Sequence, residues 1–128
     1  MAKVPVYISF DYDHDDDLKV MLVGQARNPD SPFDIVDHSV KAASANWKDD
    51  ARTRIRRSQQ VIVLCGEHTD TATGVSAEIT IANEEVKPHF LLRGRSDKSC
   101  KRPTAATTDE KIYNWTWDNL KKLVAGSR

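Results

Sequence analysis

Glu78 is a candidate for chemistry because its neighbours in the sequence offer it no partner. It follows a segment of small residues, 66–74, and the residues one turn after it, Ile81 and Ala82, are apolar. The residue three positions before it is Val75, so Glu78 is not the acid of a capping box. Two interpretations follow: a solvated acid near the positive end of a helix, or a functional carboxylate in a ligand crevice.

The residues around Glu78 predict where it lies in the fold. The run Val61–Cys65 is short, apolar and rich in β-branched residues, which indicates a strand buried on both faces of a parallel sheet. Ligands bind outside the carboxyl ends of such strands, so the segment 66–74 and the helix after it are where we expect chemistry. The apolar positions of that helix are Val75, Ile79, Ala82 and Val86.

The composition limits the class of protein. The chain has 128 residues with 19 basic and 19 acidic side chains, so we expect a single domain, 1–128, without an overall electrostatic attraction to nucleic acid or membranes. No apolar run approaches the roughly 20 residues of a membrane span, and the start does not resemble a signal peptide. A cytoplasmic location is expected. Cys65 and Cys100 lack metal-ligand spacing, so neither a metal site nor a disulfide is predicted, and Cys65 is interpreted as a core residue.

The first strand is followed by the acidic segment DYDHDDD. It is not a calcium loop, because the sixth and twelfth positions lack the required glycine and acid. We expect Asp13, Asp15 or Asp16 to cap the next helix and to stabilise its positive end. Phe10 and Asp11, where the strand meets the loop, are candidates for ligand contact.

Strands and helices alternate through the chain, which predicts an α/β fold: a flavodoxin-like open parallel sheet of about five strands with helices on both faces. The expected strands are Val4–Phe10, Phe33–Asp37, Val61–Cys65, His89–Leu92 and Lys111–Tyr113. The expected helices have apolar positions at Leu18, Met21, Leu22 and Ala26, at Trp47, Ala51 and Ile55, at Val75 to Val86, and at Trp117, Leu120 and Val124.

Two basic segments have open interpretations. The helix beginning at Trp47 carries Arg52, Arg54, Arg56 and Arg57, which form either a solvated face or a surface for a partner or phosphate. The segment 93–108 is long, basic and without a periodic pattern, and loops of that length in small domains are usually functional or disordered.

Three stretches of the sequence resemble a known protein family. They are VYISFDYDHDD from Val6, RTRIRRSQQVIVLCG from Arg52, and HTDTATGVSAEITIA from His68. With the element order above, the sequence resembles Toll/interleukin-1 receptor (TIR) domains, and most of all the compact TIR-like proteins of bacterial Thoeris anti-phage defence. A phosphorylation receiver is disfavoured, because the third strand ends in Leu64 and Cys65 where that fold needs a phosphoacceptor aspartate.

The resemblance implies an enzyme that cleaves the N-glycosidic bond of NAD and converts the ADP-ribose into a signalling nucleotide, which activates a separate effector protein. NAD is then the substrate, and no cofactor is needed. Glu78 matches the glutamate of TIR enzymes, Phe10 would lie against the nicotinamide or ribose, and Ser9 and Asp11 would shape the rim of the pocket. Backbone N–H groups from Gly66 through His68 to Thr69, and the start of the Glu78 helix, would hold phosphate.

The resemblance leaves several properties open. TIR enzymes generally complete their pocket by self-association, so self-association is expected here. The Trp-Cys pair that precedes the glutamate in many TIR enzymes is replaced by Val75-Ser76-Ala77. A linear or a cyclic product, the activating trigger, and contact of His68 or the basic loop Arg93–Arg102 with substrate all stay open. The competing interpretation is a TIR-like module that binds a nucleotide or protein without chemistry.

Overall fold

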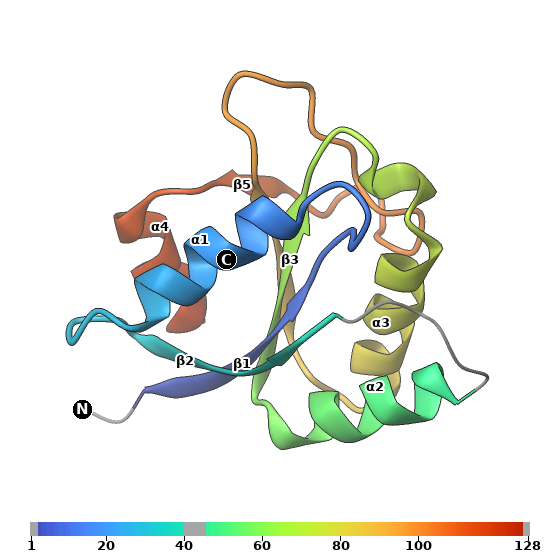
Figure 1. The fold of residues 1–128 in the computed structure, drawn as a ribbon, viewed down its shortest axis with the longest axis horizontal. Coiled ribbons are helices and arrows are strands. Elements are labelled where there is room, and N and C mark those ends of the chain that lie inside the picture. Colours follow the sequence, from blue (N-terminus) through green and yellow to red (C-terminus); the bar gives the residue numbers. More distant parts are fainter. Residues whose placement is uncertain (1–2, 40–45, 127–128) are drawn as a thin grey trace.

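The computed structural model describes residues 3–39 and 46–126 of the chain. Strands and helices alternate along these residues (Figure 1). The strands are β1 (Val4–Ser9), β2 (Phe33–His38), β3 (Gln60–Cys65), β4 (His89–Arg93) and β5 (Ile112–Asn114). The helices are α1 (Asp16–Ala26), α2 (Trp47–Arg57), α3 (Thr73–Glu84) and α4 (Trp117–Val124), with a single 3-10 turn, η1 (Thr69–Thr71), before α3.

The strands form one sheet in the order β2-β1-β3-β4-β5, and all neighbouring strands are parallel. The predicted flavodoxin-like α/β architecture is therefore confirmed. The chain runs outward from β1 to β2 and then returns to β3 on the other side of β1. The carboxyl ends of β1 and β3 flank this reversal, which is the place where open α/β sheets bind ligands.

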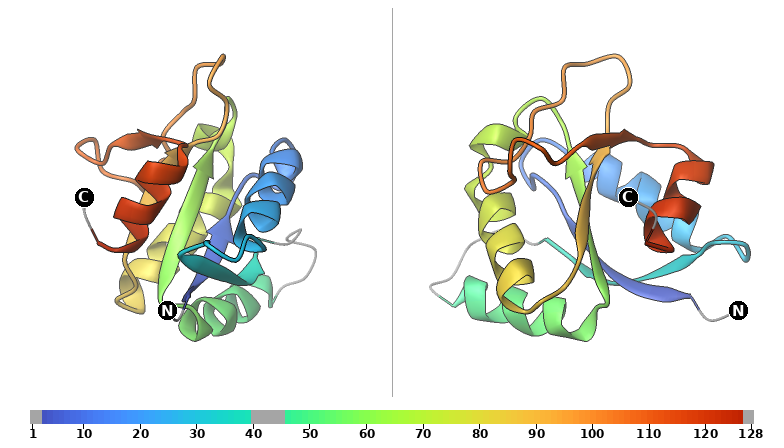
Figure 2. Two further views of the ribbon diagram at one scale, coloured as in Figure 1. Left: turned by 90° about the vertical axis from the view of Figure 1, so that its left-hand side faces the viewer. Right: turned by 180° about the vertical axis from the view of Figure 1, so that it is seen from behind.

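Two apolar layers hold the helices on the sheet. Helices α1 and α4 cover one face, and α2 and α3 cover the other (Figures 1 and 2). Side chains alternate along β1, so that Val6 and Ile8 face the first layer and Tyr7 faces the second. All of β3 is buried, as predicted for a central parallel strand. Cys65 belongs to the second layer, as predicted, and burial raises the pKa of its thiol to about 12.

The prediction that an aspartate side chain caps α1 by a hydrogen bond is wrong. Asp15 occupies the N-cap position, but no side chain caps the helix. Asp15 is instead buried and bonds to Arg95 from the loop after β4, with 3.1 Å between Oδ1 and Nη2. Asp16 and Asp17 lie in the first turn of α1, where their charge suits the helix dipole.

Arg95 ties the long basic loop to the start of α1. Besides Asp15, its guanidinium donates to both carboxylate oxygens of Asp17, at 3.0 and 2.8 Å, and to the carbonyl oxygen of His14 at 3.2 Å. Asp15 packs so closely on Gly66 that a Cβ there would lie 2.4 Å from Asp15 Oδ2, so this approach requires glycine. The loops after β1, β3 and β4 are thus joined at one edge of the sheet.

The arginines of α2 are not simply solvated, as one interpretation of the sequence expected. Arg52 and Arg56 pair with Glu85 at the end of α3, at 2.7 and 2.6 Å, and Arg52 also pairs with Glu84 at 2.6 Å. Arg54 pairs with Asp37 of β2 at 3.1 Å. Because Arg56 and Glu84 are largely exposed, solvent screens these pairs, and each of them contributes little to the free energy of unfolding. The pairs fix α2 against α3 and β2.

Two predicted core positions are wrong. Met21 is 56% exposed, because Leu18, Leu22 and Ala26 form the buried side of α1. Val86 is 86% exposed and lies beyond the end of α3, with a left-handed φ of 56°. The N–H groups of residues 86 and 87 donate to the carbonyls of Asn83 and Ala82, which closes the helix in the manner usually served by glycine.

The left-handed backbone at Val86 predicts that Val86→Gly stabilises the protein. A β-branched side chain at positive φ costs about 1–2 kcal/mol, and glycine relieves this while its freer unfolded chain takes back about 0.5–1 kcal/mol. We expect the free energy of unfolding, measured by urea titration, to rise by up to about 1 kcal/mol. Val20→Gly, at an exposed valine inside α1, is the matched control and should lower it. A loss of stability in both variants contradicts the prediction.

Candidate functional site

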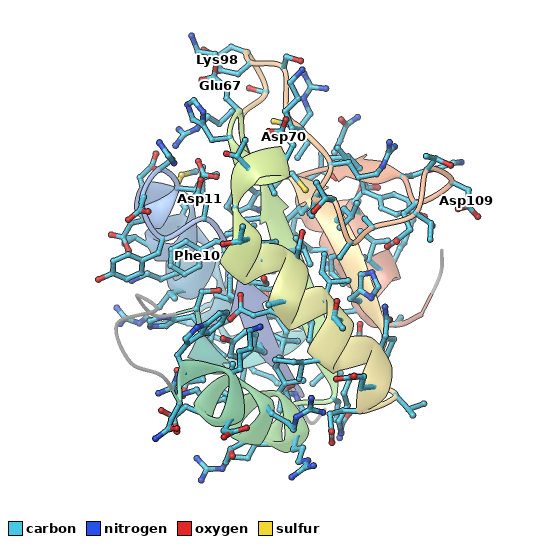
Figure 3. The ribbon with its side chains drawn as sticks, turned by 90° about the vertical axis from the view of Figure 1, so that its right-hand side faces the viewer. Phe10, Asp11, Glu67, Asp70, Lys98 and Asp109 are labelled. Carbon is cyan, nitrogen blue, oxygen red and sulfur yellow. The ribbon has the colours of Figure 1, made fainter. Side chains whose placement is uncertain are left out.

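A pocket of about 280 Å³ opens at the carboxyl edge of the sheet, between the loop after β1, the end of β2 and the first turns of α2 and α3. Figure 3 shows Phe10 and Asp11 beside the N-terminal part of α3, while Glu67 and Lys98 lie at the outer loop tips. The pocket is lined by Phe10, Asp11, Tyr12, Asp13, His14, Ser39, Trp47, Thr71, Ala72, Thr73, Gly74, Val75 and Glu78.

Glu78 lies in the pocket wall and is only 3% exposed. It projects from the second turn of α3 toward the sheet, on the same side of the helix as Val75, Ile79 and Ala82, which are all buried. The interpretation of Glu78 as a solvated acid is therefore wrong. A buried carboxyl group next to a hollow needs hydrogen-bond partners, because burying it without them is costly.

Three hydroxyl groups supply these partners. Tyr7 Oη donates to Glu78 Oε2. Ser9 Oγ donates to Oε1 at 2.8 Å, and Ser39 Oγ donates to the same oxygen at 2.5 Å. Tyr7 and Ser9 are two residues apart on β1 and so point to the same face, toward α3. Ser39 comes from the residue after β2. Strand β1 and the residue after β2 thus together fix both carboxylate oxygens.

The environment holds Glu78 between its two protonation states near neutral pH. Burial disfavours the charged form and raises the pKa of Glu78 to about 7, although the hydrogen bonds from Ser39, Tyr7 and Ser9 and the charge of Arg54 act in the opposite direction. The pKa of Tyr7 is raised well above its ordinary value by burial and by the charge of Glu78. Tyr7 therefore keeps its proton throughout the physiological pH range and donates a hydrogen bond to Glu78.

Aromatic and acidic side chains form part of the remaining pocket wall. The Phe10 ring is 2% exposed and stacks on Tyr12, with 6.2 Å between ring centroids. Trp47 contributes a second aromatic wall from the start of α2. Asp11 is buried, and its carboxylate accepts from the Asp13 N–H at 3.1 Å and lies 2.7 Å from His14 Nδ1. No lysine or arginine lines the pocket among the described residues.

The structure brings together only part of the predicted site. Glu78, Phe10 and Asp11 line the pocket, and Ser9 touches it through Glu78. Gly66, His68 and Thr69 do not line it. The Gly66 N–H donates to Thr69 Oγ1 at 2.7 Å, and Thr69 is fully buried, so this N–H is not directed to a phosphate. His68 is exposed, and its ring lies 4.2 Å from that of His14.

Tyr7, Ser39 and Trp47 are residues of the site that the sequence analysis does not predict. Tyr7 and Ser9 are polar residues at a spacing of two in an otherwise apolar strand, and this spacing signals a shared buried partner. Only Ser9 was noted, as a rim residue. Trp47 is predicted only as part of a helix face, and no role is predicted for Ser39, because the sequence does not show which helix start and which strand end meet Glu78.

The described residues contain no cluster of three or more histidine, cysteine, aspartate or glutamate side chains suited to a metal ion. Within those same ranges, none of the helices is at once long and apolar enough to cross a lipid bilayer.

The raised pKa of Glu78 predicts how stability depends on pH. The group has a pKa of about 7 in the folded protein and 4.5 in the unfolded chain, so the folded state binds the proton more tightly. Its contribution to stability is therefore complete below pH 4.5 and is lost as the pH rises through about 7. In Glu78→Gln this loss is absent. We expect the stability of the variant relative to wild type to grow by roughly 3 kcal/mol between pH 4 and 8, since one pKa unit is about 1.4 kcal/mol.

Urea unfolding of both proteins across this pH range measures the difference. Comparison with wild type at each pH removes the opposing contribution of acids such as Glu85, whose pKa is lowered to about 2 by Arg56 and Arg52. Parallel stability curves for wild type and variant contradict the prediction.

The comparison with protein families agrees with the fold and with the sequence resemblance. Residues 7–99, which include Tyr7, Ser9, Ser39 and Glu78, match the family described as Thoeris protein ThsB, TIR-like domain. The search of curated proteins finds no match. The matched segment runs from β1 into the loop after β4, and so contains the whole wall of the pocket. The chain belongs to the TIR-like domain family of the Thoeris anti-phage defence protein ThsB.

Proposed function

We propose that the protein cleaves the N-glycosidic bond of NAD, releases nicotinamide, and converts the ADP-ribose into a cyclic signalling nucleotide in anti-phage defence. The observation that carries the proposal is the carboxyl group of Glu78, buried at a pocket that has aromatic and acidic side chains in its wall and no lysine or arginine among the described lining residues.

The pocket wall suits the nicotinamide end of NAD. The pyridinium ring is flat and positively charged, and such rings bind well over the faces of aromatic side chains and close to carboxylates. Phe10, Tyr12 and Trp47 supply the aromatic faces, and Asp11 and Asp13 supply the negative charge. A phosphate would be repelled by the same wall, so the ligand enters with its cationic ring first.

Glu78 suits the reaction itself. When the bond between the ribose carbon and the pyridinium nitrogen breaks, the electron pair leaves with nicotinamide and positive charge develops on the ribose ring, as in glycoside hydrolysis. An ionised carboxylate that is already fixed in place stabilises this charge without reorganisation. Water, or a nucleophile within the adenosine half, then attacks the ribose carbon and releases a proton, giving a linear or a cyclic product.

The volume of the pocket indicates where the diphosphate and adenosine of NAD would lie. At about 280 Å³ it lies at the small end of ligand sites, enough for nicotinamide and its ribose but not for a whole dinucleotide. Thr73, Gly74 and Val75 at the start of α3 also line it. The positive end of α3 would therefore face the diphosphate, and the adenosine half would lie outside the pocket.

Self-association would complete the site around this exposed half, which makes a second copy of the chain the proposed partner. The nucleotide product would act on a separate effector protein. NAD serves as substrate, and the mechanism uses no cofactor.

A second candidate function is nucleotide binding without chemistry. It is favoured by the three hydroxyl donors that already engage both oxygens of Glu78. A carboxylate satisfied in this way could serve as a rigid polar anchor for a ligand rather than as a stabiliser of a transition state.

Glu78→Gln is expected to lower nicotinamide release by about 10²–10³-fold, because the amide cannot stabilise positive charge on the ribose. The assay incubates concentrated protein with NAD, alone and with phage lysate, and detects nicotinamide by liquid chromatography. Glu84→Gln, the same change at an exposed position of the same helix, is the control and should retain activity.

Equal release by wild type and Glu78→Gln would remove Glu78 from the mechanism while keeping the activity. Binding of NAD without nicotinamide release under either condition would favour the second candidate function.

The same carboxyl group predicts the pH dependence of the reaction. If the ionised form of Glu78 acts, kcat/KM rises with pH and becomes constant above the pKa of about 7. The profile is measured as initial nicotinamide release between pH 5 and 9. A profile that falls over this range would indicate that the protonated form acts, as a general acid.

A further inference from the structure

The hydrogen-bonding capacity of Glu78 is nearly used up in the structure. A carboxylate offers about four acceptor positions, two on each oxygen. Oε1 accepts from both Ser9 and Ser39, and Oε2 accepts from Tyr7. Among the described residues, these donors leave one position on Oε2. A ligand could place one hydroxyl there, but a pair of neighbouring hydroxyls needs a second position.

The three donors differ in their access to the pocket. Tyr7 and Ser9 are fully buried in β1 and do not line the pocket. Ser39 lines it next to Glu78. A ligand that enters the pocket therefore meets Ser39 directly, whereas the other two hydroxyls lie behind the carboxylate.

Ser39 also has another acceptor within reach. Its backbone N–H donates to the carbonyl oxygen of Ile8 at 2.8 Å, which fixes the residue beside β1. Its Oγ lies 3.4 Å from the same carbonyl oxygen and accepts from the Phe10 N–H at 3.1 Å. The hydroxyl proton can therefore turn from Glu78 to Ile8 without leaving the oxygen unpaired.

We propose that the ligand displaces the hydrogen bond from Ser39 to Glu78. In the free protein the Ser39 hydroxyl donates to Glu78 Oε1, and when ligand binds, one hydroxyl of a vicinal diol donates to Oε1 in its place. The inference rests on the proposed function and deepens it, because it gives Ser39 a part in admitting the ribose hydroxyls to Glu78. Ser39 is then a positioning residue that keeps Glu78 in place in the free protein and gives way to the substrate.

The test measures binding of a carbocyclic NAD, in which a cyclopentane carries the same two hydroxyls but cannot form the charged ring of the reaction. Calorimetry at about pH 9 compares wild type with Ser39→Ala and Ser39→Thr, since Glu78 is ionised well above its pKa of about 7. Because the alanine variant has no hydroxyl to displace, we expect it to bind about tenfold tighter. The threonine variant keeps the hydroxyl and should bind as wild type does.

A second probe is the same carbocyclic NAD lacking one of the two hydroxyls. It needs only the open position on Oε2, so wild type and Ser39→Ala should bind it equally. Ser39→Cys, nearly isosteric but a poor donor, should behave like the alanine variant, which guards against misfolding of one variant.

A further readout separates this role from a merely structural one. The Ser39 hydrogen bond lowers the pKa of Glu78, so Ser39→Ala should move the pH midpoint of ligand binding upward. The proposal is overturned if Ser39→Ala binds the diol probe no tighter than wild type, or if it gains equally with the probe that lacks one hydroxyl.

Nicotinamide release is assayed separately, so that the two ideas fail independently. A diol-specific gain in affinity without nicotinamide release would support the role of Ser39 and contradict the NAD-cleaving activity. Release of nicotinamide, with equal affinities of wild type and the Ser39 variants for the diol probe, would support the NAD-cleaving activity and contradict the role of Ser39. Absence of binding in all variants at millimolar probe would contradict the role of Ser39, whatever the release assay shows.

Discussion

Packing of α3 on the sheet takes the carboxyl group of Glu78 out of bulk water, and hydroxyl groups from β1 and from the end of β2 meet it there. Two opposing effects follow from this single arrangement. Burial favours the neutral acid, whereas three donors favour the carboxylate, and the balance places the pKa at about 7. A group poised in this way changes charge in response to small changes in its surroundings, including the arrival of a cationic ligand.

The topology of the sheet explains why the site forms at this place. Because β1 lies between β2 and β3, its carboxyl end is the only one in the described sheet that adjoins both the end of β2 and the loop that leads to α3. The loop after β1 must then be held still if it is to form a pocket wall. Arg95 fixes this loop by bonding to Asp15, Asp17 and the backbone of His14. The basic loop that follows β4 thus has a structural part in the site without lining it.

Sequence reasoning recovered the fold well and the site in part, for a physical reason. Apolar period and β-branched content report burial directly, so the central strand 61–65 and the helices around it were placed correctly. The pocket depends on contacts between distant segments, and such contacts leave little trace in one sequence: Ser39 and Trp47 meet Glu78 only in three dimensions. The predicted capping by Asp15 is wrong because its carboxylate bonds to Arg95, which is distant in the sequence. Val86 followed the helical period, but the chain had already turned out of α3.

Tyr7 belongs both to the apolar core and to the candidate site. Its ring is part of the apolar layer under α2 and α3, and its hydroxyl holds Glu78. The interior packing and the acidity of the reactive group are consequently not separate properties that selection or an engineer could adjust one at a time. A change that repacks this layer also retunes the carboxyl group, and heat that loosens the layer should abolish function and native structure in a single step.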